Sequence, residues 1–218
     1  MFRWALLVVA LYGLLLVVLT LLLLSVASNW PLNPLNLLGV WEYWAFIFVQ
    51  LLCQAALLLV PVRHSRARPT SRISLLPALI GAGLLMGILA LGASLALLGL
   101  VRGDEAWNSP AEAWGPLVVG GLVWFGWSVM FFRLSRRDPL DVVSRQCRML
   151  LKASILELLV AVPTHVVVRH RDYCCAGFLT FVGLVAGISV MLASFGPGVY
   201  FLFLDRWKQL HPWQSKGD

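Results

Sequence analysis

The stretch WALLVVALYGLLLVVLTLLLLSVA, from Trp4 to Ala27, decides the fold class of this chain because it contains no charged residue. An α-helix rises about 1.5 Å per residue and the hydrocarbon core of a bilayer is about 30 Å thick, so about 20 apolar residues are enough for one crossing. A strand of a membrane β-barrel would alternate apolar and polar residues, whereas this run is apolar almost throughout. The run therefore predicts a membrane-spanning helix.

A cleaved secretory signal is the competing interpretation of this first run. Arg3 precedes it, and Ser25-Val26-Ala27 resembles a small-residue cleavage site. The apolar core of a signal is usually about 7–15 residues long, however, and this run is longer. We therefore expect a retained membrane anchor at about 4–27.

The rest of the chain repeats the same apolar pattern. Of its 218 residues, 60% are hydrophobic and 12% are charged, and the charged share is about half of that in a soluble domain. This composition excludes a disordered chain, a disulfide scaffold and nearly every soluble enzyme. Further apolar runs cover 37–62, 75–101, 116–132 and 176–204, and a short polar tail follows at 205–218. We predict an all-α fold, a polytopic helical bundle that forms one transmembrane domain in the lipid bilayer.

The segment 149–168 is ambiguous because it is apolar but carries Lys152, Glu157 and His165. Its polar or small residues recur at steps of three and four, which places them on one face of a helix. These residues are Cys147, Ser154, Glu157, Ala161 and then Thr164 or His165. Two interpretations fit: a spanning helix with its polar side inside a bundle, or an amphipathic helix in the membrane interface. We favour six crossings, because a stretch of about 20 residues is available here.

Charged residues indicate the orientation of the predicted spans. Arginines are concentrated in the segments 63–72 and 133–152, whereas the loop 102–115 contains three acidic residues and one Arg. Loops rich in Lys and Arg stay in the cytoplasm, so we expect both termini to be cytoplasmic and the chain to lie in the cell membrane. The net charge of +7 is then mostly a topology signal. Because no aromatic residues alternate with the basic ones, we expect no binding of nucleic acid.

The first candidate site comprises Ser154, Glu157, Thr164 and His165. An ionisable group at membrane depth is costly and by default indicates function. Glu157 is the clearest case, and we expect its partner to be His165, two turns further on, or Lys152. Its carboxylate could handle protons or help to bind a metal or haem. The alternative is a shallow position, or a link between two helices.

The second candidate site groups His165, His170, Cys174 and Cys175. With six crossings, the two cysteines lie on the oxidising side of the membrane, where thiols pair or bind metal. Imidazole and thiolate ligands suit copper(I) or zinc, and haem is a further possible cofactor. Adjacent cysteines seldom ligate one tetrahedral metal together, so an inert pair, or a bond from one of them to another chain, is the alternative.

Glycines predict where the helices pack closely. Gly83 and Gly87 form one G-x-x-x-G spacing, and Gly183 and Gly187 form another. Small residues at this spacing let helices approach each other in lipid. Near the C-terminus, Gly196-Pro197-Gly198 predicts a kink, a break or a hinge, because proline lacks an N–H group and clashes with the preceding helical turn.

The sequence contains none of the common hydrolase, nucleotide-binding or metalloprotease motifs. We therefore expect a non-catalytic polytopic subunit or accessory protein of a larger membrane complex, in contact with other membrane protein subunits. Two alternatives remain open. One is a metal- or haem-handling membrane protein that uses the region 157–175. The other is a small transporter or channel, in which Ser154, Glu157 and Thr164 line a path and Gly196-Pro197-Gly198 acts as a hinge.

Overall fold

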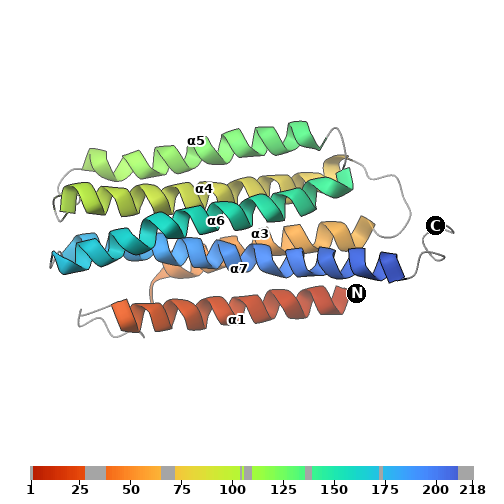
Figure 1. Cartoon of the computed structure of the whole chain (residues 1–218), viewed down its shortest axis with the longest axis horizontal. Coiled ribbons are helices and arrows are strands. Elements are labelled where there is room, and N and C mark those ends of the chain that lie inside the picture. Colours follow the sequence, from red (N-terminus) through yellow and green to blue (C-terminus); the bar gives the residue numbers. More distant parts are fainter. Residues whose placement is uncertain are drawn as a thin grey trace.

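The computed structural model is a bundle of long helices (Figure 1). The backbone is described for residues 2–27, 38–64, 72–103, 105, 110–135, 139–171 and 174–210, and the side chains for 6–22, 38–58, 75–103, 105, 114–135, 143–171, 176–195 and 197. Within these ranges the regular structure is helical and contains no strand. The helices are α1 (Phe2–Ala27), α3 (Trp41–His64), α4 (Arg72–Arg102), α5 (Pro110–Leu134), α6 (Pro139–His170) and α7 (Cys174–Leu210). The predicted all-α fold class is confirmed.

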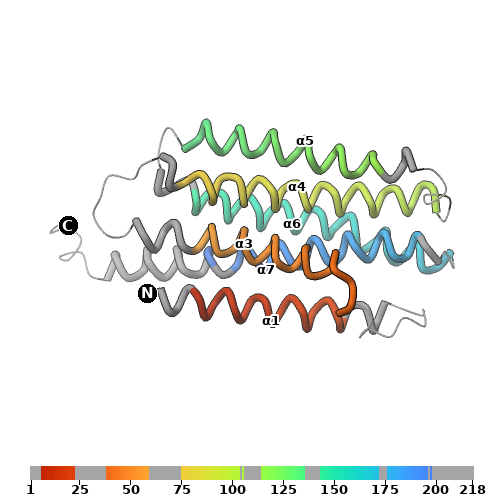
Figure 2. Tube along the Cα trace, turned by 180° about the vertical axis from the view of Figure 1, so that it is seen from behind, coloured from red at the N-terminus to blue at the C-terminus, as the bar shows by residue number. Residues whose placement is uncertain are grey.

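Successive helices run in opposite directions along the bundle, and the view from behind shows the same arrangement (Figure 2). Helix α1 begins and α7 ends at one end, which we call the N-terminal end; the other is the opposite end. Helix α4 lies in the middle and packs against α3, α5, α6 and α7, whereas α1 packs against α3 and α7. At the opposite end, α4 is followed by Gly103 with φ of 57°, a left-handed conformation that favours glycine at a helix C-terminus.

Five of the described helices are long and apolar enough to cross a membrane. Their spans are Trp41–Leu58, Leu75–Arg102, Trp114–Leu134, Val143–His170 and Ala176–Phe195. In α1, the apolar stretch with described side chains is Leu6–Leu22. The chain is therefore a multi-pass membrane protein.

The ambiguous segment 149–168 is the middle of α6, one continuous helix that packs along α7 and α4. Its polar residues Ser154 and Glu157 are buried inside the bundle. Its exposed side chains are apolar: Ile155, Leu156, Leu159, Val162 and Val166. A helix in the membrane interface turns its polar face to water, whereas this helix buries its polar face and exposes its apolar one, as membrane-spanning helices do. The structure therefore favours the spanning interpretation.

Helix α7 continues through Gly196-Pro197-Gly198 and ends at Leu210, so the predicted break is not observed. Pro197 is fully buried. Proline is tolerated within membrane-spanning helices because neighbouring groups and local adjustment compensate for the lost backbone hydrogen bond. A hinge at this position stays a prediction.

Candidate functional site

Glu157 lies halfway along the membrane-spanning part of α6. The span Val143–His170 has 28 residues, with 14 of them before Glu157 and 13 after it. At about 1.5 Å per residue, the carboxyl-bearing residue is about 20 Å from either end of the span. Only 5% of its surface is exposed. The candidate site is therefore at the centre of the bundle, as far from both ends as the helix allows.

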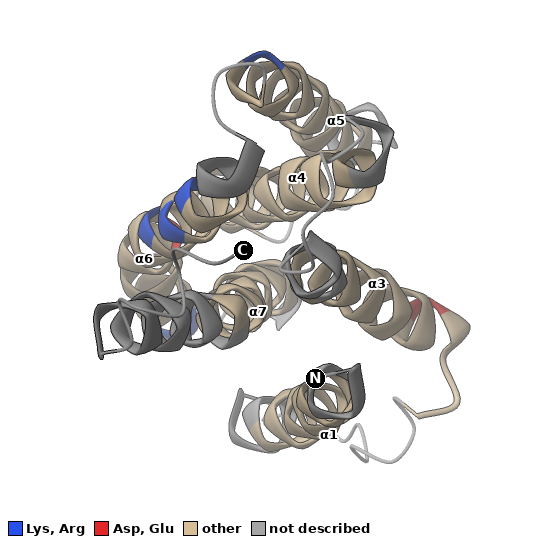
Figure 3. Cartoon of the chain, turned by 90° about the vertical axis from the view of Figure 1, so that its right-hand side faces the viewer, with Lys and Arg blue, Asp and Glu red and all other residues tan. Residues whose placement is uncertain are grey.

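Three glycines from two other helices surround the Glu157 carboxyl. A Cβ atom added to Gly92 of α4 would lie 3.3 Å from Oε1, and one added to Gly183 of α7 would lie 3.5 Å from it. At Gly187 of α7, an added Cβ would overlap Oε2. The end view shows α6 beside both α4 and α7 (Figure 3), in agreement with these contacts. Glycine at these positions makes the space that the carboxyl fills.

The Glu157 carboxyl oxygens have no hydrogen-bond partner among the described residues. Of the partners expected from the sequence, Lys152 has an exposed side chain, and His165 is hydrogen-bonded to Thr180 instead. An ionised carboxylate buried without a partner is costly in a bilayer, which is why such groups bind protons, cations or polar substrates. Among the described residues, Glu157 is thus an acid without a hydrogen-bond partner, and close packing surrounds it.

Ser154 and Thr164 share the buried face of α6 with Glu157. Ser154 Oγ donates a hydrogen bond to the Leu151 carbonyl (2.9 Å), and Thr164 Oγ1 donates to the Val160 carbonyl (2.7 Å). Both hydroxyls therefore have partners within their own helix. The structure brings these residues to one face, but Glu157 is the only one of the three with an unpartnered polar atom among the described residues.

His165 and His170 have separate environments. His165 Nδ1 is 2.8 Å from Thr180 Oγ1 of α7, so this pair links α6 and α7 towards the opposite end. His170 is exposed, and its Nδ1 is 2.8 Å from the Val166 carbonyl. The side chains of Cys174 and Cys175 lie outside the described residues. Among the described side chains, no three His, Cys, Asp or Glu residues are grouped as metal ligands, and the predicted copper, zinc or haem site stays a prediction.

The two glycine spacings face different neighbours. Gly83 and Gly87 of α4 face α5, where an added Cβ at Gly83 would meet Ser128 and one at Gly87 would lie 2.8 Å from the Gly120 carbonyl oxygen. Gly183 and Gly187 of α7 instead face α4 and Glu157. One glycine pair therefore attaches α5 to the bundle, and the other forms part of the candidate site.

A second polar cluster, which the sequence reasoning missed, joins α1, α3 and α7. Gln50 Nε2 of α3 donates to Ser189 Oγ of α7 (2.7 Å). Tyr12 of α1 is 2.7 Å from Gln50 Oε1 and 2.9 Å from the Ser189 carbonyl oxygen, and its single hydroxyl proton can serve either acceptor. The available signal was an amide side chain within an apolar run, since polar residues in spanning helices hydrogen-bond across helices.

The fold and this site define the protein as a multi-pass helical membrane protein with a central carboxyl that has no hydrogen-bond partner among the described residues. No family model, curated protein or solved structure matches the chain. Its function is therefore inferred from the site itself.

Proposed function

We propose that this chain is a small proton-translocating transporter, with Glu157 as the group that binds and releases the proton. The observation that supports the proposal is the position of the carboxyl: halfway along the membrane-spanning part of α6, 5% exposed and without a partner among the described side chains. Intramembrane carboxyl groups that face a bundle interior are typical of proton relays in pumps and transporters. A purely structural glutamate would be expected to have a donor.

The tight packing favours a proton over a metal cation as the bound species. Both oxygens of Glu157 lie against glycine backbone, with Gly92 and Gly183 close to Oε1 and Gly187 close to Oε2. A hard cation such as Ca²⁺ takes six to eight oxygen ligands, whereas three glycines lie beside this carboxyl and its oxygens have no hydrogen-bond partner among the described residues. A proton needs no such shell of ligands.

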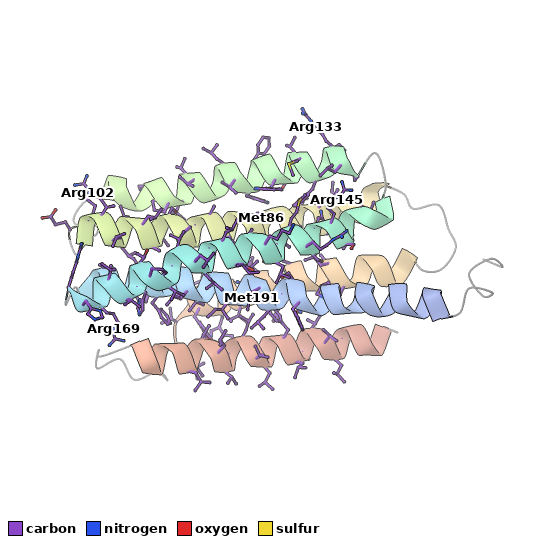
Figure 4. The ribbon with its side chains drawn as sticks, in the orientation of Figure 1. Met86, Arg102, Arg133, Arg145, Arg169 and Met191 are labelled. Carbon is purple, nitrogen blue, oxygen red and sulfur yellow. The ribbon has the colours of Figure 1, made fainter. Side chains whose placement is uncertain are left out.

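In the proposed orientation, the protein lies in the cell membrane and the N-terminal end of the bundle faces the cytoplasm. Arg133 and Arg145 lie at the N-terminal end of the bundle, and Arg102 and Arg169 lie at the opposite end (Figure 4). In the sequence, further arginines follow α3 and α5, both of which end at the N-terminal end. Cytoplasmic loops are enriched in Lys and Arg. Both chain termini are then cytoplasmic.

The test is proton flux into liposomes that contain the purified protein, followed with an internal pH-sensitive dye under an imposed membrane potential. We expect flux in the wild type and its loss in Glu157→Gln, which keeps the shape of the side chain but cannot release a proton. Glu42→Gln is the matched control, because Glu42 carries the same group at an exposed position in the first turn of α3. The proposal would be refuted if the wild type and Glu157→Gln gave equal flux. It would also be refuted if liposomes with the wild-type protein gave no more flux than empty liposomes.

A second candidate function is the one expected from the sequence: a subunit of a larger membrane complex. The supporting observation is α5, which packs on α4 and has only 11% of its span buried, against 61% for α7. Its exposed face holds Phe125 beside Gly121 and Gly126, and nothing lies within 4 Å of a Cβ added to either glycine. Open glycine notches on a lipid-facing helix suit the close approach of another helix.

This candidate predicts that a partner protein co-purifies in mild detergent and is crosslinked from a photoreactive side chain at position 121. Gly121→Leu, which fills the notch, should release the partner. Gly177→Ala, at another glycine with open surroundings, should retain it. A chain that purifies alone, without a crosslink in native membranes, would exclude this role.

A further inference from the structure

Unpartnered buried polar atoms also occur at two glutamines in the bundle, Gln146 and Gln54. Gln146 of α6 is 0% exposed and Gln54 of α3 is 1% exposed. Both side-chain amide atoms of Gln146, and Oε1 of Gln54, have no hydrogen-bond partner in the described part of the chain. Buried polar groups without a protein partner are the places where proteins hold ordered water, which makes about three hydrogen bonds.

Gln146 shares a helix face with Glu157. It precedes Glu157 by eleven residues, which is about 16 Å along the axis and about 20° around it. It follows the first residue of the span, Val143, by three positions, and therefore lies near the N-terminal end. Between it and Glu157, Leu150 and Ser154 are fully buried on the same face. This face is a line of positions that leads from the N-terminal end to the carboxyl.

Gln54 lies in the same half of the bundle. It precedes Leu58, the last residue of the α3 span, by four positions, and α3 ends at the N-terminal end (Figure 1). Its neighbour Cys53 packs against Gly81, close to the start of the α4 span. Two different helices thus present unpartnered amides in the half of the bundle between Glu157 and the N-terminal end.

The other half of the bundle is closed by hydrogen bonds and close packing. His165 is hydrogen-bonded to Thr180, and the exposed Arg171, which directly follows α6, donates from Nη1 to the Leu100 carbonyl of α4 (3.4 Å). A Cβ added to Gly99 would lie 3.1 Å from the Ala176 carbonyl oxygen. Between Glu157 and the opposite end, no described side chain has a buried polar atom without a partner.

We infer that Glu157 exchanges its proton with the N-terminal end of the bundle, through water bound by Gln146 and Gln54. This inference rests on the proposed proton-translocating function. Water at Gln146 would extend the aqueous phase into the bundle, and the proton would then pass the buried Leu150 and Ser154 before it reaches Glu157. The bonded His165–Thr180 pair closes the route towards the opposite end in this conformation.

The test is the rate at which the Glu157 carboxyl exchanges hydrogen for deuterium in membranes placed in D₂O, followed by infrared spectroscopy. The band is assigned as the carboxylic-acid stretch that Glu157→Gln removes. We expect Gln146→Leu to slow the exchange by about tenfold, which is roughly 1.4 kcal/mol in the barrier. Gln146→Asn, which keeps an amide, and Thr164→Val, on the other side of Glu157, should exchange at a rate close to that of the wild type.

If Thr164→Val slowed the exchange and Gln146→Leu did not, the inference would be overturned. It would also be overturned if the wild-type spectrum contained no carboxylic-acid band that Glu157→Gln removes. If Gln146→Leu does not fold, Gln54→Leu provides the same test with the same expected slowing. Slow exchange in the glutamine variants without proton flux in the wild type would support the route but refute the transport function. Normal exchange in both variants, with flux that depends on Glu157, would refute the route alone.

Discussion

Replacing Gly187 with alanine tests the contact between α7 and Glu157 by a single added methyl group. The new Cβ would overlap Oε2 of Glu157 and would lie 2.8 Å from Cγ and Cδ2 of Leu158. Both neighbours belong to α6, so either their side chains or the whole helix must move. The variant therefore crowds the contact between two helices whose packing forms the candidate site.

The expected magnitude follows from two opposing effects. Overpacking in a tightly packed interior costs about 1–3 kcal/mol. Alanine is a better helix former than glycine by about 1 kcal/mol, which offsets part of this cost. We expect a net loss of about 0–2 kcal/mol in the free energy of unfolding for Gly187→Ala. Gly121→Ala and Gly177→Ala add the same methyl group where nothing lies within 4 Å, so they should be neutral or slightly stabilising.

The assay is reversible unfolding in mixed detergent micelles, followed by tryptophan fluorescence. A double-mutant cycle with Glu157→Ala identifies the clashing group, because groups in contact show coupling energies of about 0.5–3 kcal/mol. Gly87→Ala is the control for the cycle, since it crowds Gly120 and Trp124 of α5 rather than Glu157. Equal stability of Gly187→Ala and Gly121→Ala, or no coupling to Glu157→Ala, would refute the packing described for this site.

Three further predictions concern other parts of the bundle. Gln50→Leu should lower the unfolding free energy by about 1 kcal/mol in the same assay. Interhelical hydrogen bonds in membranes average about 0.6 kcal/mol each, and this side chain makes two. An unchanged unfolding free energy would contradict the hydrogen bonds described for Gln50. Thr180→Val removes the hydroxyl bonded to His165 and should cost about 0.6 kcal/mol, and the same substitution should cost nothing further once His165 is replaced by phenylalanine. A membrane-impermeant maleimide should label Cys174 in intact cells if both termini are cytoplasmic. Labelling only after permeabilisation would show that the protein has the opposite orientation.

The sequence predicted those features that depend on one helix at a time. The apolar run at 75–101 corresponds closely to the span Leu75–Arg102, and the stripe that includes Ser154 and Glu157 lies on one buried face. These predictions succeed because length and helical periodicity are local properties. Of the outcomes expected at Pro197, a break is not observed because α7 stays helical there, and a kink or a hinge stays a prediction.

Features that depend on which helices meet could not be predicted in the same way. The spacing of Gly183 and Gly187 indicates a close contact but does not say that Glu157 of α6 occupies it, together with Gly92 of α4. A carboxyl in a spanning helix is equally compatible with a donor across the interface, and the absence of a donor among the described residues is visible only in three dimensions.

The most direct test of the central claim modifies Glu157 in the unaltered sequence. Dicyclohexylcarbodiimide is an apolar reagent that reacts with carboxylic acids inside membranes, and peptide mapping by mass spectrometry measures how much of Glu157 carries it. We expect the modified fraction of Glu157 and the loss of proton flux to rise together in the same liposomes. Undiminished flux after complete modification of Glu157 would contradict the claim that this carboxyl carries the proton.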